Sequence, residues 1–417
     1  MTAVDMERRR APGRAADFSS RIRPTGRGDY DDMIDRITAL IQAGFSAIGR
    51  AAGLLVAWLL WPFMAAHGWY SRRNWLIKGP IALIVILLAG FYGYFVWQTQ
   101  VWTNFDPDYI SRYKLAERTV PPGQELPTAT PAAAAGATGV AANTSAPVCQ
   151  RSAIVDAAAD LTDFNVNQNA WISSMLLYRL GLFGMEWDST PFLDNKASFQ
   201  RGVNQAVRRT SVELVDTLGR VRGTSGINNN LQEARGNMQF SEYSWYFGLD
   251  PFGPKTPTPS YYRAAIRSFQ AFNGELTACK AVFDTRADNL IQFIDRISGD
   301  IGSTSAILRE RSENYNGGWF DTRADDRFWF AYGQLYGYYG VLSAAGADFA
   351  QVIRERNLTN LWNDTLLQTR AALRIQPAII SNGEESGWIM PSHLATMGFY
   401  VLRVRSNLVE LRSVLDR

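Results

Sequence analysis

One uninterrupted run dominates the pattern of apolar residues along the chain. Between Gly79 and Trp97 the sequence reads GPIALIVILLAGFYGYFVW and holds no charged residue. A helix needs about 20 mostly apolar residues to cross the hydrocarbon core of a bilayer. Aromatic residues gather near both ends of the run, as they do at the depth of lipid headgroups. The pattern predicts a transmembrane helix over residues 77–98, with a buried core helix as the alternative.

Basic residues are concentrated on the N-terminal side of this predicted helix, whereas the flank that follows it, NFDPDYISRYK, is nearly balanced in charge. Basic flanks of membrane helices stay in the cytoplasm. The N-terminus is therefore expected in the cytoplasm and the C-terminal domain in the periplasm, with the helix in a bacterial inner membrane. No cleavable signal peptide is recognisable, so the helix is expected to remain as an anchor. The basic residues before the run are Arg8, Arg9, Arg10, Arg14, Arg21, Arg23, Arg27, Arg36, Arg50, Arg72, Arg73 and Lys78.

A second apolar run, AAGLLVAWLLWPFMAA, covers residues 51–66 and contains Pro62. Ahead of it, apolar residues between Met33 and Ile48 recur at helical spacing opposite polar ones. Residues 31–76 are expected to form an amphipathic helix and then an interfacial or re-entrant helix on the inner leaflet. A hairpin of two transmembrane helices is the alternative, and the sequence leaves it open.

Two segments lack the periodicity of packed helices. Residues 1–30 are rich in Arg, Gly, Asp and Ser and predict a disordered basic cytoplasmic tail. This tail either touches anionic lipid headgroups or serves only to set the topology. Residues 99–148 include the tract PPGQELPTATPAAAAGATGVAANTSAP, which predicts an extended periplasmic linker region.

Helical periodicity returns over residues 149–417. Apolar residues between Ile266 and Ile301 recur at three- and four-residue steps, and the same pattern appears over 199–218, 323–357 and 394–415. Pro and Gly gather at 250–259, 316–318 and 381–387, as is typical of loops between helices. The predicted fold class is all-α, with an N-terminal membrane anchor helix and a periplasmic bundle of antiparallel helices.

Charge and cysteine content refine the picture of this outer domain. The formal net charge of +3 comes from the N-terminal side, because Asp and Glu slightly outnumber Lys and Arg in the outer domain. No nucleic-acid partner is therefore expected. Cys149 and Cys279 both lie in the predicted periplasmic part, where disulfides form. A Cys149–Cys279 disulfide is expected, with two free buried thiols as the alternative.

The sequence contains no motif of a known enzyme class: no H-E-x-x-H, Walker A, nucleophile elbow or dinucleotide fingerprint occurs. With only two histidines no multi-histidine site is expected, and neither a metal nor a cofactor is predicted. Paired carboxylates suit glycosidase-type chemistry, and tryptophans beside them suit carbohydrate stacking. The candidate catalytic residues are His393, Glu186, Asp188 and Glu385, with Asp194 and Glu242 as further carboxylates, and the candidate binding residues are Trp187, Trp245 and Trp388. The pattern favours the blander interpretation, in which His393 is structural and the tryptophans fill the core.

Small residues recur in the aromatic stretch FWFAYGQLYGYYGVLSAAGADF. Gly333, Gly337 and Gly340 lie at three- and four-residue steps, which places them on one face of a helix. Such a face permits close helix contact inside the bundle, which is the favoured interpretation. A surface for a partner helix, a lipid or a second copy of the chain is the functional alternative, so these glycines are also candidate binding residues.

Several stretches resemble the domain of unknown function 2333 family of Gram-negative bacteria. They are FDTRADNLIQFIDRISGDIGSTSAIL, WFAYGQLYGYYGVLSAAGADFAQVIRERN, SGWIMPSHLATMGFYVLRVRSNLVELRSVL and WDSTPFLDNKASFQRGV. Residues 286–290 and the pair Ser392–His393 carry the most specific short matches. The resemblance covers most of the chain after about residue 75 and implies a membrane anchor followed by a helical outer region. It implies no reaction, and the basic N-terminus and Ala/Pro tract are longer than the family pattern.

Two functions follow from these observations. The first is a non-enzymatic structural, scaffold or interaction component of the cell envelope, anchored in the lipid bilayer and binding a protein partner or a second copy of itself. The alternative is an envelope enzyme or carbohydrate-binding module that acts on peptidoglycan-like ligands through carboxylates and tryptophans. The scarcity of motifs favours the first.

Overall fold

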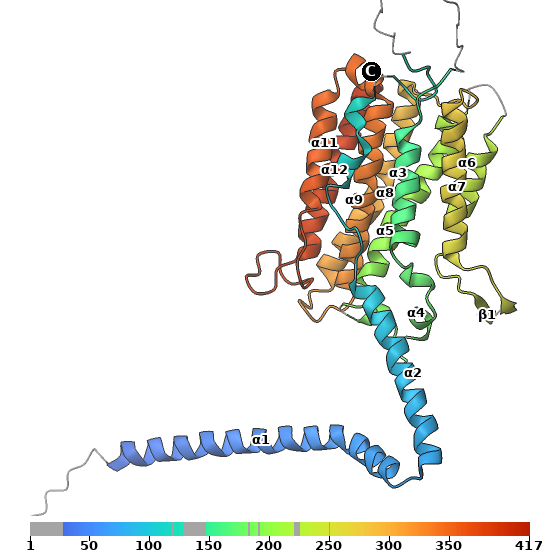
Figure 1. Ribbon diagram of the computed structural model, residues 1–417. Helices are drawn as coiled ribbons and strands as arrows, with labels where there is room; N and C mark the ends of the chain where they lie inside the picture. Colours follow the sequence, from blue (N-terminus) through green and yellow to red (C-terminus); the bar gives the residue numbers. More distant parts are fainter. Residues whose placement is uncertain are drawn as a thin grey trace, which may run out of the picture. The chain divides into compact units, whose positions relative to one another are not determined.

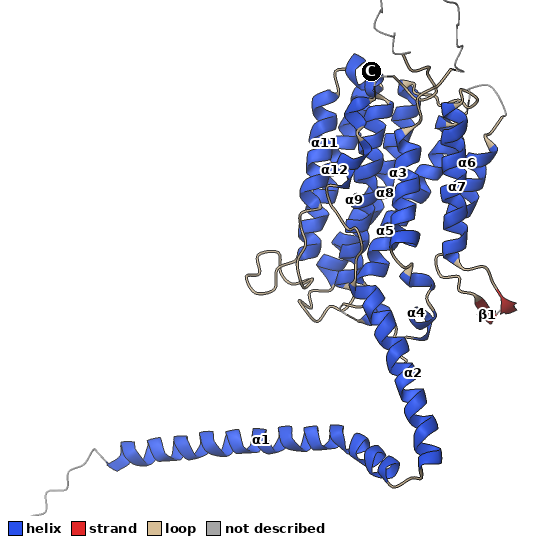
Figure 2. Cartoon of the chain, in the orientation of Figure 1, coloured by secondary structure: helices blue, strands red, loops and turns tan. Residues whose placement is uncertain are grey.

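A computed structural model describes residues 28–118, 120–127, 147–181, 184–190, 192–220, 226–249 and 251–417. The chain divides into two compact units, residues 1–87 and 88–417. Most of the predicted basic tail and of the Ala/Pro-rich tract lies outside the described residues. The predicted all-α fold is confirmed, since helices form nearly all regular structure of the described residues (Figures 1 and 2).

The first unit contains α1 (Gly28–Ser71) and the beginning of α2 (Trp75–Gln100). Both helices are long and apolar enough to cross a membrane, and their apolar side chains are almost entirely exposed. The two helical stretches expected over residues 31–76 are one continuous helix in the structure, because α1 runs on through Pro62. Two apolar helices near the N-terminus are consistent with a membrane anchor.

The second unit is a bundle of antiparallel helices. Its long helices are α3 (Ala153–Asp163), α5 (Asn195–Glu213), α6 (Asn229–Met238), α7 (Thr258–Thr277), α8 (Ala287–Asn314), α9 (Ala324–Asp348), α11 (Thr359–Ala372) and α12 (His393–Leu415). Shorter elements are α4 (Leu176–Leu180), α10 (Ala350–Glu355) and an antiparallel hairpin of β1 (Phe247–Leu249) and β2 (Phe252–Pro254). Single turns of 3-10 helix are η1 (Tyr109–Tyr113), η2 (Leu115–Glu117), η4 (Ile172–Ser174) and η5 (Trp187–Ser189). Two π-helical turns, η3 (Phe164–Gln168) and η6 (Leu214–Leu218), extend α3 and α5.

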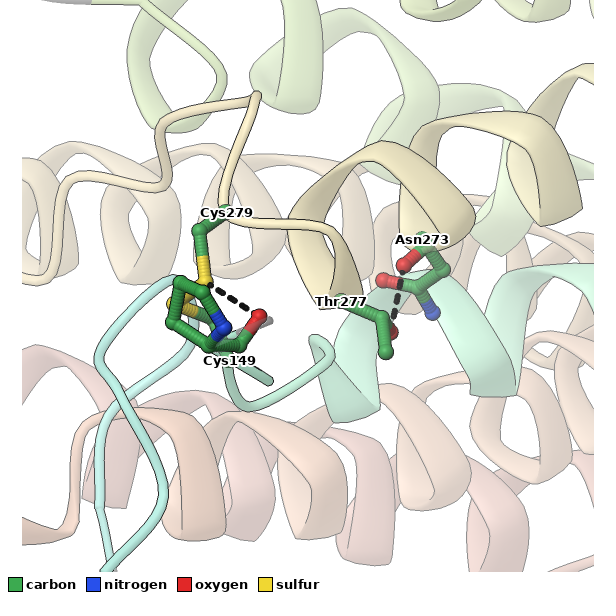
Figure 3. The surroundings of a disulfide bond; sticks show 5 residues. Cys149, Asn273, Thr277 and Cys279 are labelled. Carbon is green, nitrogen blue, oxygen red and sulfur yellow. Dashed lines mark hydrogen bonds between the residues drawn. A yellow bond between two sulfur atoms is a disulfide. The ribbon is translucent and has the colours of Figure 1, made fainter. Parts of the chain in front are cut away.

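Because successive long helices alternate in direction, their connections fall at two ends of the bundle (Figure 1). The α4 end holds α4, the β-hairpin and the loops that lead into α5, α9 and α12. The disulfide end holds the connections after α5, α7 and α9 and the C-terminus. The predicted disulfide between Cys149 and Cys279 is formed there, with the two Cα atoms 5.3 Å apart (Figure 3). The amide of Cys149 also donates to the carbonyl of Thr277 at 3.0 Å, so the bond joins the start of the bundle to the end of α7.

Close contact between α5 and α9 forms the centre of the core. A Cβ atom at Gly333 would lie 2.1 Å from the carbonyl oxygen of Phe199, and one at Gly202 would lie 2.1 Å from that of Phe330. Only glycine lets two backbones approach this closely. Phe199, Phe328, Tyr332 and Tyr336 fill the space beside these glycines and are almost fully buried.

The segment after α2 differs from the expected linker. Residues 102–115 lie against the bundle, and Tyr109 is buried with its hydroxyl donating to the carbonyl of Tyr336 at 2.7 Å. The aromatic rings of Trp102 and Phe105 pack around Phe199. These apolar contacts explain why this part of the predicted linker is ordered. The Pro/Ala-rich composition that predicted a linker begins only further along the chain.

Candidate functional site

Three carboxylates converge at the α4 end of the bundle. Asp188 lies in η5, Asp194 in the turn before α5, and Asp326 in the first turn of α9. One carboxylate oxygen from each lies within 4.8 Å of the other two. Asp194 and Asp326 are buried, and Asp188 is half-buried. Three acidic groups thus share one small region of the bundle, and two of them are buried.

Hydroxyl groups orient two of these carboxylates. Ser198, one turn into α5, donates to Oδ1 of Asp326 at 2.5 Å, and Tyr178 of α4 donates to Oδ1 of Asp188 at 2.6 Å. Asp194 has neither kind of partner, since both of its oxygens are buried without a hydrogen bond in the described structure. Among the described residues, each cluster member thus retains at least one oxygen that accepts no hydrogen bond.

Burial governs the ionisation of the cluster. Loss of water around Asp194 raises the pKa of its carboxyl group, and the neighbouring carboxylates of Asp326 and Asp325 raise that pKa further. Burial raises the pKa of Asp325, the residue before Asp326, to about 8. It also raises the pKa of Asp326, against the lowering effect of the bond from Ser198. These carboxyl groups therefore bind protons more tightly in the folded chain than in an unfolded one.

Two basic residues of α5 lie near the cluster, and Arg201 alone of the two pairs with one of its carboxylates. Arg201 of α5 donates to the hydroxyls of Tyr243 (2.9 Å) and Ser198 (2.8 Å), and its Nη2 atom lies 3.8 Å from Asp326. The Nζ of Lys196 donates to the carbonyls at positions 98 and 101, at the end of α2. Burial lowers the pKa of Lys196 to about 8. Neither side chain bonds to Asp194, so its charge has no partner among the described residues.

A cavity of about 310 Å³ gives access to the cluster from the surface. Asp188 and Asp326 form part of its wall. Its remaining polar lining is mixed in charge and comes from α5, the segment before the β-hairpin, α8 and the start of α9: Arg201, Glu242, Tyr243, Thr304, Arg323 and Arg327. The cavity is large enough for a small ion with its water molecules, or for a small polar ligand.

The structure places the sequence-predicted residues near Asp188 in different environments. Glu186 is exposed and lies outside the acidic cluster. Trp187 is 1% exposed, with its indole N–H donating to the carbonyl of Leu177 at 2.6 Å and its ring 4.8 Å from that of Phe95. Trp187 is therefore a core residue that holds the end of α2 and offers no surface to a ligand.

The other predicted catalytic and binding residues do not join the acidic cluster. His393 begins α12, where its Nδ1 accepts a hydrogen bond from the amide of Ser381 at 2.9 Å, and burial lowers its pKa. Glu385 and Trp388 lie in the loop before α12, and Trp388 is 93% exposed. Trp245 is half-buried ahead of the β-hairpin. These residues form no pair of carboxylates with a tryptophan beside it.

The predicted glycine face is occupied by the chain itself. All three glycines are buried in α9. Gly333 and Gly337 face α5, while a Cβ atom at Gly340 would lie 2.3 Å from the hydroxyl of Tyr109. These contacts match the interpretation as close packing inside the bundle, and they leave the face no room for an external helix.

Sequence reasoning identified Asp188 and Asp194 but missed Asp326, Ser198 and Arg201. The adjacent acidic residues Asp325 and Asp326 were visible, but acidic residues at the start of a helix are common caps. No local spacing connects them with Asp194, because the contact depends on how α5 and α9 pack.

These observations define the chain as an all-α protein with apolar N-terminal helices and a disulfide-linked bundle that holds an acidic cleft. The chain belongs to the DUF2333 family, described as uncharacterized proteins conserved in bacteria, whose model matches residues 163–317 and 309–417. The acidic cluster lies within the matched region. No curated protein and no solved structure shows a match to the chain.

Proposed function

We propose that the chain is an inner-membrane-anchored component of the bacterial envelope, whose helical domain stands in the periplasm against the outer surface of the membrane. Its role is structural: the domain acts as a scaffold or interaction module held at the surface of the bilayer. The apolar helices, the basic N-terminal side and the disulfide support this proposal.

Charge and redox chemistry together favour a single crossing by α2. The arginine-rich N-terminus belongs in the cytoplasm, and the disulfide belongs in an oxidising compartment. If both α1 and α2 crossed the membrane, these two parts would share one side. At about 1.5 Å per residue, α1 would also be roughly twice as long as the hydrocarbon core is thick. We therefore place α1 along the inner leaflet.

The proposed contact between the domain and the membrane rests mainly on where the exposed aromatic side chains lie. In the described part of residues 88–417, outside α2, the exposed aromatic residues lie in the loops and the β-hairpin of the α4 end. Phe399, early in α12, is the exception. At the disulfide end the exposed large apolar residues are aliphatic, such as Ile227 and Val282. The α4-end residues are Phe192, Tyr243, Tyr246, Phe247, Phe252, Tyr315, Trp319, Phe320 and Trp388.

The same end receives the last turns of α2. Phe95 packs on Trp187, and the side chain of Gln100 donates to the carbonyl of Phe192 at 2.9 Å. Aromatic rings prefer the headgroup region of a bilayer, where an apolar body and a polar edge are both accommodated. An aromatic-rich end beside a candidate transmembrane helix suits contact with lipid headgroups.

Depth-dependent quenching tests this placement. The full chain is reconstituted in nanodiscs with a bimane label on Phe252→Cys or, as the matched control, on Val282→Cys. Nitroxide lipids are expected to quench the label at position 252 strongly and the label at position 282 weakly. Equal quenching at both positions would overturn the proposed contact.

A reporter fusion tests the topology independently. Alkaline phosphatase fused after Arg417 is expected to be active, because that enzyme folds only in an oxidising compartment. A fluorescent reporter that matures only in the cytoplasm is expected to stay dark at the same position. The opposite result would place the domain inside the cell and refute the proposed orientation.

The acidic cleft is the observation that favours the alternative, an envelope enzyme or a module binding peptidoglycan-like ligands. The tryptophans give it little support, because Trp187 is buried and Trp388 lies in another loop. Titration of the full chain with soluble muropeptides separates the two functions. Binding that Asp188→Asn abolishes and Glu385→Gln leaves intact would favour the alternative. Absence of binding, together with self-association or a specific partner captured by crosslinking in cells, is expected for a scaffold.

A further inference from the structure

The acidic cluster of the α4 end has the arrangement of an ion-binding site. Asp188, Asp194 and Asp326 come from three separate elements, and their nearest oxygens lie within 4.8 Å of one another. Like charges this close repel strongly where water is excluded. A fold that brings them together needs protons or a cation to offset the repulsion.

Asp194 supplies an independent sign of a missing positive partner. Its side chain is 0% exposed, and neither oxygen has a hydrogen-bond donor in the described structure. Buried carboxylates are normally satisfied by amides, hydroxyls or cationic side chains. Lys196 bonds to backbone carbonyls, whereas Arg201 bonds to hydroxyls and pairs with Asp326 at 3.8 Å, so neither cation contacts Asp194. One oxygen of Asp194 points into the space shared with Asp188 and Asp326.

The other two carboxylates are held as metal ligands usually are. In each, Oδ1 accepts a hydrogen bond from a hydroxyl group: Ser198 for Asp326 and Tyr178 for Asp188. Outer partners of this kind fix the orientation of a ligand and leave the second oxygen available. The adjoining cavity, of about 310 Å³, provides an entry path and room for coordinating water.

We propose that Asp188, Asp194 and Asp326 bind a hard divalent cation, Ca²⁺ or Mg²⁺, at the α4 end of the bundle. The cluster offers only oxygen donors, without His or Cys, which is the ligand set that these ions prefer over zinc or copper. The bound ion links η5, the start of α5 and the start of α9. Water from the cavity completes its coordination.

Equilibrium dialysis of the full chain in detergent, after treatment with a chelator, tests the site with ⁴⁵Ca²⁺ alone and in competition with Mg²⁺. The wild-type chain is expected to bind one ion. Asp194→Asn and Asp326→Asn are expected to weaken binding by at least about tenfold. Glu385→Gln, which removes an exposed carboxylate at the same end, is expected to bind as the wild type does. If Mg²⁺ at equal concentration displaces ⁴⁵Ca²⁺, the site also binds Mg²⁺. If it does not, the site prefers Ca²⁺.

Thermal unfolding provides a second test of ion binding, which also shows whether each variant is folded. Without metal, Asp194→Asn is expected to melt at or above the wild-type temperature, because an amide replaces a buried acidic group that has no hydrogen-bond donor in the described structure. Added Ca²⁺ or Mg²⁺ is expected to raise the melting temperature of the wild type and not of the variant. Ser198→Ala is expected to fold and to bind the ion several-fold more weakly. A wild-type chain that binds neither ion, or an Asp194→Asn chain with unchanged affinity, would overturn the proposal.

Discussion

Asp348, the last residue of α9, accepts a hydrogen bond from the backbone amide of Ala153, the first residue of α3, at 2.8 Å. Its other oxygen accepts from the amide of Ile154 and the hydroxyl of Ser152. One carboxylate thus satisfies two of the amides that every helix start leaves unpaired. It does so from a different helix, which fastens α3 to α9 at the disulfide end.

Replacing this carboxylate is expected to destabilise the bundle. Asp348→Ala leaves buried amides without an acceptor and is expected to lower the free energy of unfolding by about 2–4 kcal/mol. Urea unfolding of the chain in detergent, followed by circular dichroism, measures the change. Asp348→Asn retains one acceptor oxygen and is expected to lose less. Equal midpoints for Asp348→Ala and the wild type would show that α3 needs no such cap.

The disulfide is expected to contribute strongly to stability, because it joins residues 130 positions apart. A closed loop of this length restricts the unfolded chain by about 4–5 kcal/mol in the loop-entropy model. The double variant Cys149→Ser, Cys279→Ser is therefore expected to unfold at a clearly lower urea concentration than the wild type. Dithiothreitol should shift the wild type to the midpoint of the variant and leave the variant unmoved. A variant midpoint equal to that of the oxidised wild type would contradict the expectation.

Substitution by alanine is expected to have opposite effects on stability at two glycines, one in the contact between α5 and α9 and one on an exposed helix face. Gly333→Ala places a methyl group against the backbone of Phe199 and is expected to cost about 2–3 kcal/mol or more. Gly299→Ala, on the exposed face of α8, has no atom within 4 Å of the new methyl group. It is expected to stabilise the helix by roughly 0.5–1 kcal/mol. Thermal unfolding of both variants measures the difference, and stabilisation by both would mean that α9 can move away from α5.

The contrast between Gly333 and Asp326 shows what the sequence could predict. The spacing of glycines along one helix revealed a tight face, because the periodicity of a helix is local. The spacing did not reveal that Phe199 of α5 would be the neighbour. Asp326 joins Asp194 only through that same packing, and each alone looks like an ordinary residue near a helix start. The all-α fold and the cysteine pair were predictable from local pattern and residue chemistry. The acidic cluster depends on long-range packing that no local pattern encodes.

His393 is expected to make the stability of the bundle dependent on pH. Burial lowers its pKa in the folded chain, so the unfolded chain takes up the proton more readily. The contribution of this group is therefore present above the unfolded pKa of about 6.5 and is lost as the pH falls below it. Protonation of Nδ1 would also remove the bond from the Ser381 amide.

The variant His393→Asn separates this titration from the rest of the chain, because an asparagine oxygen can replace Nδ1 as the acceptor for Ser381 but does not titrate. Urea midpoints of the wild type and the variant are measured between about pH 7.5 and pH 5. The wild type is expected to lose stability relative to the variant as the pH falls, since only its unfolded state gains a proton at this position. The acidic cluster is intact in both chains, so its own titration cancels in the difference. Parallel pH profiles would show that His393 is protonated equally in the folded and unfolded chains.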